Sequence, residues 1–188
     1  VYVSHASNTF RNKIMKSKNR YQGKRLGVIE EELILESGKT HIHTTVTHPG
    51  AVVILPIDNN GDIIFISQYR HSVKTNLLEL PAGTLEDKEN ILECAKRELK
   101  EEIGKAANEW VSMGELFPAP GFCSEIQYCY LAKDLYDEKL KGDEDEVIEL
   151  SPIKQKDLKD FITQNKIQDA KSLALLLRAS TLGLIKIN

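Results

Sequence analysis

Residues 83–104 read GTLEDKENILECAKRELKEEIG, a glycine turn followed by a segment with the apolar spacing of an amphipathic helix. At about 3.6 residues per turn, the apolar positions share one face: Leu92, Ala95, Leu99 and Ile103. Glu98, Glu101 and Glu102 are three and four residues apart, so their carboxylates form a stripe along the edge of that face. The pattern predicts a helix that buries one side and carries three acidic side chains beside it.

Three like charges at this spacing repel one another, which destabilises a helix unless a cation neutralises them. A divalent metal ion is one explanation, and oxygen ligands favour Mg²⁺, Mn²⁺ or Ca²⁺ over zinc. Mg²⁺ in particular prefers one or two carboxylates together with waters and substrate phosphates. The alternative is a charged helix face in contact with solvent. A longer pattern around the stripe favours the metal site.

That pattern is Gly83, then Glu89 after five residues, then RELKEEIG at residues 97–104 after seven more. It resembles the signature of the Nudix hydrolases almost position for position. One position differs, because the family has an aliphatic residue after the last glycine and this chain has Lys105. The difference affects packing at the helix end and involves no expected metal ligand.

Nudix hydrolases cleave a nucleoside diphosphate linked to another group, with divalent cations held by this helix. The resemblance therefore implies Mg²⁺ or Mn²⁺ as the cofactor. It assigns the metal and the catalytic step to Glu98 and Glu102, with Glu101 close by and Ala82 as a further ligand.

The resemblance also implies roles for four residues that hold the motif together. Arg97 and Glu89 would form an ion pair that fixes the loop to the helix. Gly83 and Gly104 would be structural positions at its two ends.

Sequence around the signature narrows the expected substrate. The strings QYR (68–70), LLELPAG (77–83) and PAPGF (118–122) resemble the ADP-ribose pyrophosphatase branch of the Nudix family. GDP-mannose and other nucleotide-sugar hydrolases share much of this pattern. The branch implies a homodimer in which the N-terminal sheet packs between subunits.

Three residues are candidates for substrate binding: Gln68, Arg70 and Glu125. The guanidinium fork of Arg70 suits a phosphate group, and the alternative is a surface arginine in an ion pair.

The acidic run from Asp143 to Glu146 has two interpretations. A run of charge is most simply a solvated loop. In the resembled branch, however, a flexible loop at this position carries a glutamate that assists the attacking water. Glu146 matches that position best, and Glu144 is the alternate.

Composition excludes several partners. The net charge of −3 with interspersed signs provides no basic surface for nucleic acid or for a membrane. Cys94, Cys123 and Cys129 are odd in number and lack a C-x-x-C spacing, which indicates reduced thiols and a cytoplasmic protein. A catalytic cysteine is the less favoured reading of the same residues.

The remaining pattern predicts an α+β fold, with a mixed β-sheet sandwiched between helices and an N-terminal antiparallel β-sheet extension. The first twenty residues are basic and weakly patterned, which suggests a mobile arm. Strands are expected at 26–36, 40–48, 51–57, 62–70, 77–83, 110–116, 126–132 and 147–150. Two further helices are expected at 154–164 and 171–181. We predict an arm and dimerisation hairpin over 1–45 and a Nudix hydrolase domain over 46–188.

Two function classes remain open from sequence. The first is an enzyme that hydrolyses ADP-ribose or a related nucleotide sugar, with a small-molecule substrate. The second is a non-catalytic Nudix module that only binds a nucleotide. The chain retains all of the expected metal glutamates, and this favours the enzyme.

Overall fold

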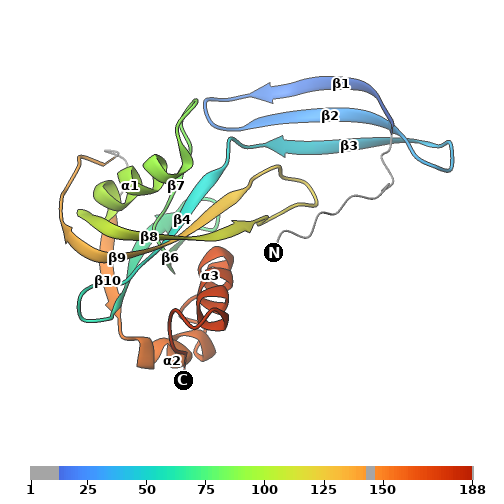
Figure 1. Cartoon of the computed structure of the whole chain (residues 1–188). Helices are drawn as coiled ribbons and strands as arrows, with labels where there is room; N and C mark the ends of the chain where they lie inside the picture. Colours follow the sequence, from blue (N-terminus) through green and yellow to red (C-terminus); the bar gives the residue numbers. More distant parts are fainter. Residues whose placement is uncertain (1–12, 143–146, 188) are drawn as a thin grey trace. The chain divides into compact units, whose positions relative to one another are not determined.

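The computed structural model describes residues 13–142 and 147–187 (Figure 1). The strands before the acidic helix are β1 (Lys13–Gln22), β2 (Gly27–Ile34), β3 (Thr40–Thr47), β4 (Ala51–Pro56), β5 (Ile63–Arg70), β6 (Thr75–Glu79) and β7 (Ala82–Thr84). They are followed by α1 (Ile91–Glu102), β8 (Lys105–Leu116), β9 (Gln127–Asp137), β10 (Ile148–Ile153), α2 (Leu158–Thr163) and α3 (Ala170–Thr181). The chain divides into two compact units. One extends to His48 and includes Ala119–Ser124, and the other comprises Pro49–Pro118 and the chain from Glu125 onward.

The first unit is an antiparallel sheet in the order β1-β2-β3. The expected hairpin of β2 and β3 is confirmed, and Gly38 in its turn has the left-handed φ of 76°. The backbone of Val46 exchanges hydrogen bonds with residues 122 and 124, which adds the 119–124 segment to this unit.

The prediction of a mobile arm over the first twenty residues is wrong from Lys13 onward, and residues 1–12 lie outside the described part of the chain. Charge complementarity explains why the basic segment forms β1. Lys16 and Lys18 lie opposite acidic residues of β2, and Arg20 forms an ion pair with Glu30. Cross-strand pairs of opposite charge stabilise such a ladder.

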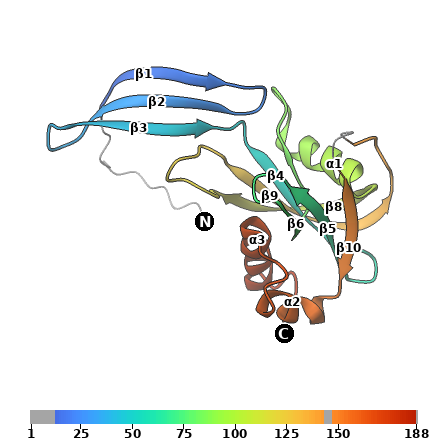
Figure 2. The same cartoon turned by 180° about the vertical axis from the view of Figure 1, so that it is seen from behind.

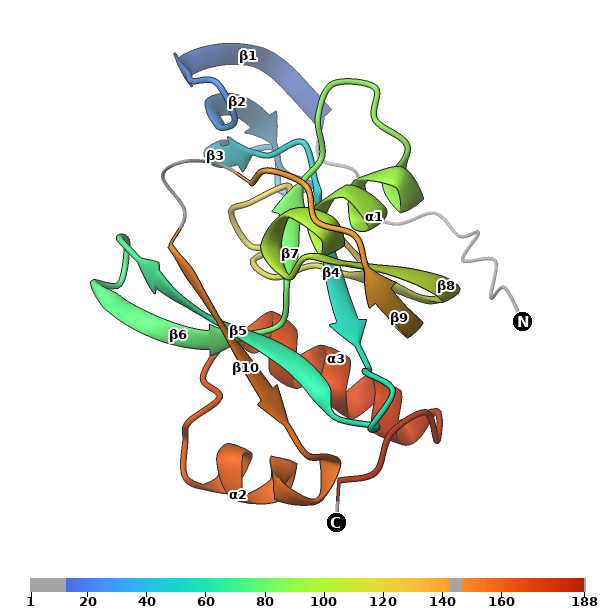
Figure 3. The same cartoon turned by 90° about the vertical axis from the view of Figure 1, so that its left-hand side faces the viewer.

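The second unit contains two sheets (Figure 3). The larger has the order β7-β4-β9-β8, with β4 and β9 parallel and its other pairs antiparallel. The smaller is antiparallel, in the order β10-β5-β6. The predicted fold class, α+β with a mixed sheet, is confirmed.

Strand β4 is buried along its whole length and supplies both faces of the larger sheet. Val53 and Leu55 belong to a cluster that includes Leu175 and Leu176 of α3. Val52 and Ile54 belong to another that includes Ala95 and Leu99 of α1. Helices α1 and α3 lie on opposite faces of the sheet (Figures 1 and 2), which confirms the expected sandwich and explains why β4 is apolar at successive positions.

The segment LLELPAG was expected to form one strand, and this prediction is wrong. Its first part belongs to β6 in the smaller sheet and its last part to β7 in the larger one. The chain crosses between the sheets at Leu80 and Pro81, where proline has no N–H to donate to a ladder. Its carbonyl instead accepts the N–H of Ile54 at 2.9 Å.

The other predicted elements are present, although β8 and β9 are longer than expected because their ladder continues between residues 105 and 137. Within the described residues, the helices are too short or too polar for any of them to traverse a bilayer.

Candidate active site

Helix α1 has a defined start and end that fix the direction of its side chains. The side chain of Asn90 accepts the N–H groups of Leu92 and Glu93, which caps the first turn. Gly104 follows the helix with a φ of 69°, a left-handed conformation that favours glycine. Of the predicted apolar face, Ala95, Leu99 and Ile103 are buried. Leu92 is only half-buried at the edge of the face, and Cys94 is buried in addition.

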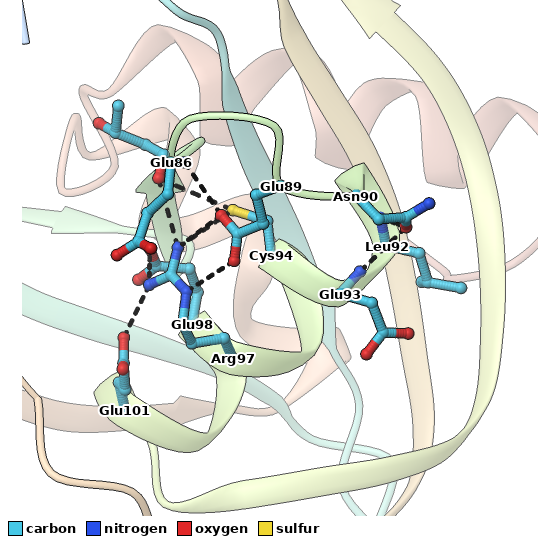
Figure 4. Close-up of polar contacts among 10 residues, drawn as sticks. Glu86, Glu89, Asn90, Leu92, Glu93, Cys94, Arg97, Glu98 and Glu101 are labelled. Atoms are coloured by element: carbon cyan, nitrogen blue, oxygen red, sulfur yellow. Dashed lines mark hydrogen bonds and ion pairs between the residues drawn. The ribbon is translucent and has the colours of Figure 1, made fainter.

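Arg97 binds three carboxylates at once (Figure 4). Its Nε and Nη2 donate to Glu89 at 2.8 and 3.0 Å, a bidentate pair that ties the preceding loop to the helix. Its Nη1 donates to Glu98 at 2.7 Å and to Glu101 at 2.9 Å. Nη2 also donates to the carbonyl of Thr84 in β7 at 3.3 Å. The guanidinium therefore offsets much of the repulsion within the acidic stripe.

Two pKa values respond to this cluster. The hydrogen bonds from Arg97, more than any other contact, lower the pKa of Glu89 from 4.5 to about 2. Burial raises the pKa of the Cys94 thiol well above its ordinary value. A thiol that stays protonated is a poor nucleophile, so the cysteine beside the acidic stripe packs in the core rather than reacting.

The backbone of β7 lies directly against the carboxylates of α1. Ala82 N–H donates to Glu102 Oε2 at 3.0 Å. A Cβ at Gly83 would lie 1.8 Å from the carboxyl carbon of Glu98, so glycine is required at this position. Glu98 is only 9% exposed and is thus packed against this glycine.

These residues have the chemistry of a divalent-cation site. Glu98, Glu101 and Glu102 provide hard oxygen donors on a rigid helix beside the backbone of Ala82, which suits Mg²⁺ or Mn²⁺. Within the described part of the chain, no three acidic, histidine or cysteine side chains are already arranged as a metal cluster. The reason is visible in the contacts, because Glu98 and Glu101 are oriented toward Arg97.

The predicted substrate-binding residues lie on β5 and just before β9. Arg70 forms a bidentate ion pair with Glu79 of β6, at 2.6 and 2.9 Å. Gln68 is buried, and within the described residues its Oε1 has no hydrogen-bond partner. Glu125 accepts a hydrogen bond from Gln127 at 2.9 Å. Their contact with a substrate stays a prediction.

Two predicted residues cannot be placed, and two residues without a predicted role form a buried ion pair. Glu144 and Glu146 lie outside the described residues. Glu79 and Lys171, which form an ion pair in the second unit, had no predicted role. One signal for Glu79 was present in the sequence, since an acid within the apolar string LLELPAG has to be paired with a cation if it is buried.

Comparison with known proteins accounts for this arrangement. Residues 46–176 match the family described as NUDIX domain. The chain belongs to the Nudix family. Its acidic helix and the glycine packed against it are therefore the Nudix signature in its folded form.

Proteins similar to this Nudix chain are named as pyrophosphatases or hydrolases of nucleotide compounds. It is 34% identical to an ADP-ribose pyrophosphatase of Bacillus subtilis over 81% of this chain and 83% of the relative. It is 33% identical to a GDP-mannose pyrophosphatase of Yersinia enterocolitica, over 73% and 76% of the two chains. A crystal structure of an ADP compounds hydrolase superposes with a TM-score of 0.83 at 25% identity, covering 94% of this chain and 96% of that one.

Proposed function

We propose that this protein hydrolyses the pyrophosphate bond of ADP-ribose or a related nucleoside diphosphate sugar, giving a nucleoside monophosphate and a sugar phosphate. The observation that supports this most directly is the packing of Glu98 and Glu102 against the backbone of residues 82–83, in a chain with the complete Nudix signature. The names of the relatives support the same class of substrate.

Each group in the proposed site has a role in that reaction. Glu98, Glu101, Glu102 and Ala82 would hold Mg²⁺ or Mn²⁺, which when bound neutralises phosphate charge and activates a water. Arg70 would bind the phosphates, and Gln68 and Glu125 would contact the substrate. Glu146, or Glu144 in its place, would orient or deprotonate the attacking water.

Arg97 has a different part in this proposal. It would keep the glutamates apart and oriented until a cation competes for Glu98 and Glu101. Its fork to Glu89 would then retain the guanidinium in place, because that pair does not involve a metal ligand.

A panel of four substrates tests the proposal: ADP-ribose, GDP-mannose, UDP-glucose and diadenosine polyphosphates. A coupled phosphatase releases phosphate from the monophosphate products and not from an intact pyrophosphate. We expect turnover of ADP-ribose or another nucleotide sugar with Mg²⁺ or Mn²⁺ and none with EDTA. Preferential turnover of GDP-mannose would select the alternative substrate. Equilibrium binding of ADP-ribose without turnover of any substrate would instead identify a non-catalytic binding module.

We further propose that the protein works in the cytoplasm on a small molecule, without nucleic acid or a membrane as partner. Cys94, Cys123 and Cys129 are free thiols, which suits a reducing compartment.

A further inference from the structure

A buried charge cluster links the smaller sheet to helix α3. The carboxylate of Glu79 is 1% exposed and receives two cations, the Arg70 fork from β5 and the ammonium of Lys171 from α3. Lys171 also pairs with Asp169 at 3.0 Å and is only 10% exposed. Arg70, by contrast, is 35% exposed, so this cluster is buried at the lysine end and open to solvent at the arginine end.

We propose that Lys171 is a positioning residue for Arg70, acting through Glu79, and so helps to set the affinity of the site for the substrate's phosphates. This inference rests on the proposed function, in which Arg70 binds the phosphates. Among the described residues, Lys171 forms its ion pairs with Glu79 and Asp169, on the buried side of Glu79. Its effect on substrate must therefore pass through the carboxylate that it shares with Arg70.

The sharing of one oxygen gives this coupling a physical basis. Nη2 of Arg70 and the ammonium of Lys171 both bind Oε2 of Glu79, while Nε of Arg70 binds Oε1. The contact with Lys171 thus fixes the plane of the Glu79 carboxylate. The paired hydrogen bonds between this carboxylate and Arg70 in turn fix the plane of the guanidinium. A guanidinium recognises phosphate through paired, coplanar N–H groups, so its orientation matters as well as its charge.

Charge balance gives a second reason. Among the described residues, two acids, Glu79 and Asp169, face two bases, Arg70 and Lys171, so that the charges of these four side chains balance. Without the lysine, two carboxylates would compete for the single guanidinium, which would be drawn inward and away from solvent. Buried charges need a partner, so a cluster missing one base has to rearrange.

The backbone of α3 is anchored at the same place. Ser172 Oγ accepts the N–H of Leu80 at 2.7 Å and donates to Asp169 Oδ2 at 2.5 Å. Leu80 is in the crossover that leads to Ala82 of the acidic site. The first turn of α3 therefore holds a fixed position against the strand that carries Glu79, as a positioning residue requires.

Two variants with opposite changes of charge test the inference. Lys171→Met and Glu79→Gln should each raise KM for the proposed nucleotide sugar about tenfold, the worth of one hydrogen bond to a charged group, with kcat changed less than threefold. If the cluster acted only through its charge, Lys171→Met would weaken binding of the anionic substrate and Glu79→Gln would strengthen it. That outcome would overturn the inference. Lys171→Arg, which retains the charge and the donor, should recover most of the affinity.

A double-mutant cycle with Arg70→Ala identifies the route. In that background Lys171→Met should have almost no further effect on KM, because the residue that it positions is absent. A full additional rise in KM would show that Lys171 acts independently of Arg70 and would contradict the proposal. Lys159→Met, at an exposed lysine on α2, is the matched control for loss of charge and should leave KM unchanged.

Two further measurements, the fraction of active enzyme and the melting temperature, distinguish an effect on folding from an effect on substrate binding. A merely structural lysine would lower the fraction of active enzyme and the melting temperature and leave KM alone, which would also contradict the inference. If Lys171→Met does not fold, Glu79→Gln and its combination with Arg70→Ala carry the same test. If wild type turns over no substrate, the proposed function fails. The same variants are then ranked by equilibrium binding of ADP-ribose, where the expected order of affinities is unchanged.

Discussion

At the scale of single residues, the acidic stripe contains two kinds of glutamate. Glu98 and Glu101 accept hydrogen bonds from Arg97, whereas Glu102 accepts the N–H of Ala82. The repulsion within the stripe is therefore relieved from one side by a guanidinium and from the other by a backbone amide. Glu102 can lose its charge without leaving Arg97 short of an acceptor, so it is the most informative position for a test of metal binding.

Glu102→Gln should abolish turnover while the protein stays folded. The amide oxygen of glutamine can still accept the Ala82 N–H, but the loss of a negative charge weakens cation binding. We expect kcat/KM to fall by roughly a hundredfold or more, because a bound metal ion contributes several kcal/mol to catalysis. Steady-state kinetics over a range of Mn²⁺ concentrations, with thermal melts, measure both effects. Glu93→Gln, at an exposed position of the same helix, is the control, and activity of Glu102→Gln within a few-fold of wild type would contradict the metal assignment.

Glu89 allows a prediction about pH. Its folded pKa of about 2 lies below the ordinary 4.5, so its pair with Arg97 stabilises the fold fully above about pH 4.5. That contribution is lost as the pH falls from 4.5 toward 2. Glu89→Gln should therefore lower the free energy of unfolding by about 1–3 kcal/mol at pH 7, and the difference from wild type should shrink below pH 4.5.

Urea unfolding at pH 7, 5 and 3 measures this difference. Asp87→Asn, at a side chain that is 92% exposed in the same loop, should show little change at any pH. A loss of stability in Glu89→Gln that is the same at pH 7 and pH 3 would mean that the carboxylate packs in the loop without a specific charge interaction.

At the scale of elements, the sequence predicts a helix or strand best where all the residues that determine it lie within one segment. Helix α1 has the apolar period, the cap and the signature within some twenty residues, and its bounds follow from these. Strand β1 lacks such evidence, because its pairing depends on the acidic residues of β2 that lie opposite it. The division of LLELPAG between two sheets also could not be predicted from the sequence, because the change of sheet depends on which partner strand each half meets.

The same reasoning applies to the site. Its glutamates and Gly83 were predictable because a contiguous motif contains them. The contact of Arg97 with Glu98 and Glu101 was missed, although i, i+4 spacing suggested the second pair. Lys171 could not be found from sequence, because its partner Glu79 is 92 residues away along the chain.

The acidic run at residues 143–146 leads to a prediction about its two glutamates. If Glu146 assists the attacking water while α1 holds the metal, Glu146→Gln should lower kcat and leave metal affinity nearly unchanged. General-base assistance is worth roughly 10² to 10⁴ in rate, and the loss should be toward the lower end if Glu144 substitutes in part. The Glu144 and Glu146 double variant should lose more than either single one. An unchanged rate in Glu146→Gln, or full rescue by added Mn²⁺, would identify the run as a solvated loop.

At the scale of the whole molecule, the sheet of the first unit buries very few of its side chains. Gly27 is the only buried residue in β1, β2 and β3, whereas Tyr21 is 60% and Ile42 is 55% exposed. A small sheet with so little buried surface gains stability when an apolar face is covered. Closed, two-fold dimers are the commonest way in which soluble proteins achieve this.

We therefore predict a homodimer whose interface includes the strands within residues 26–48. Light scattering at micromolar concentration should give twice the 21.2 kDa of the chain. Ile42→Lys should shift the mass toward the monomer, because it places a charge on the exposed face while Glu32 lies opposite in β2 to accept it. Leu177→Lys, at an exposed leucine of α3, is the control and should remain dimeric. A monomer mass for wild type would refute the dimer, and an Ile42→Lys protein that stays dimeric would place the interface on another surface.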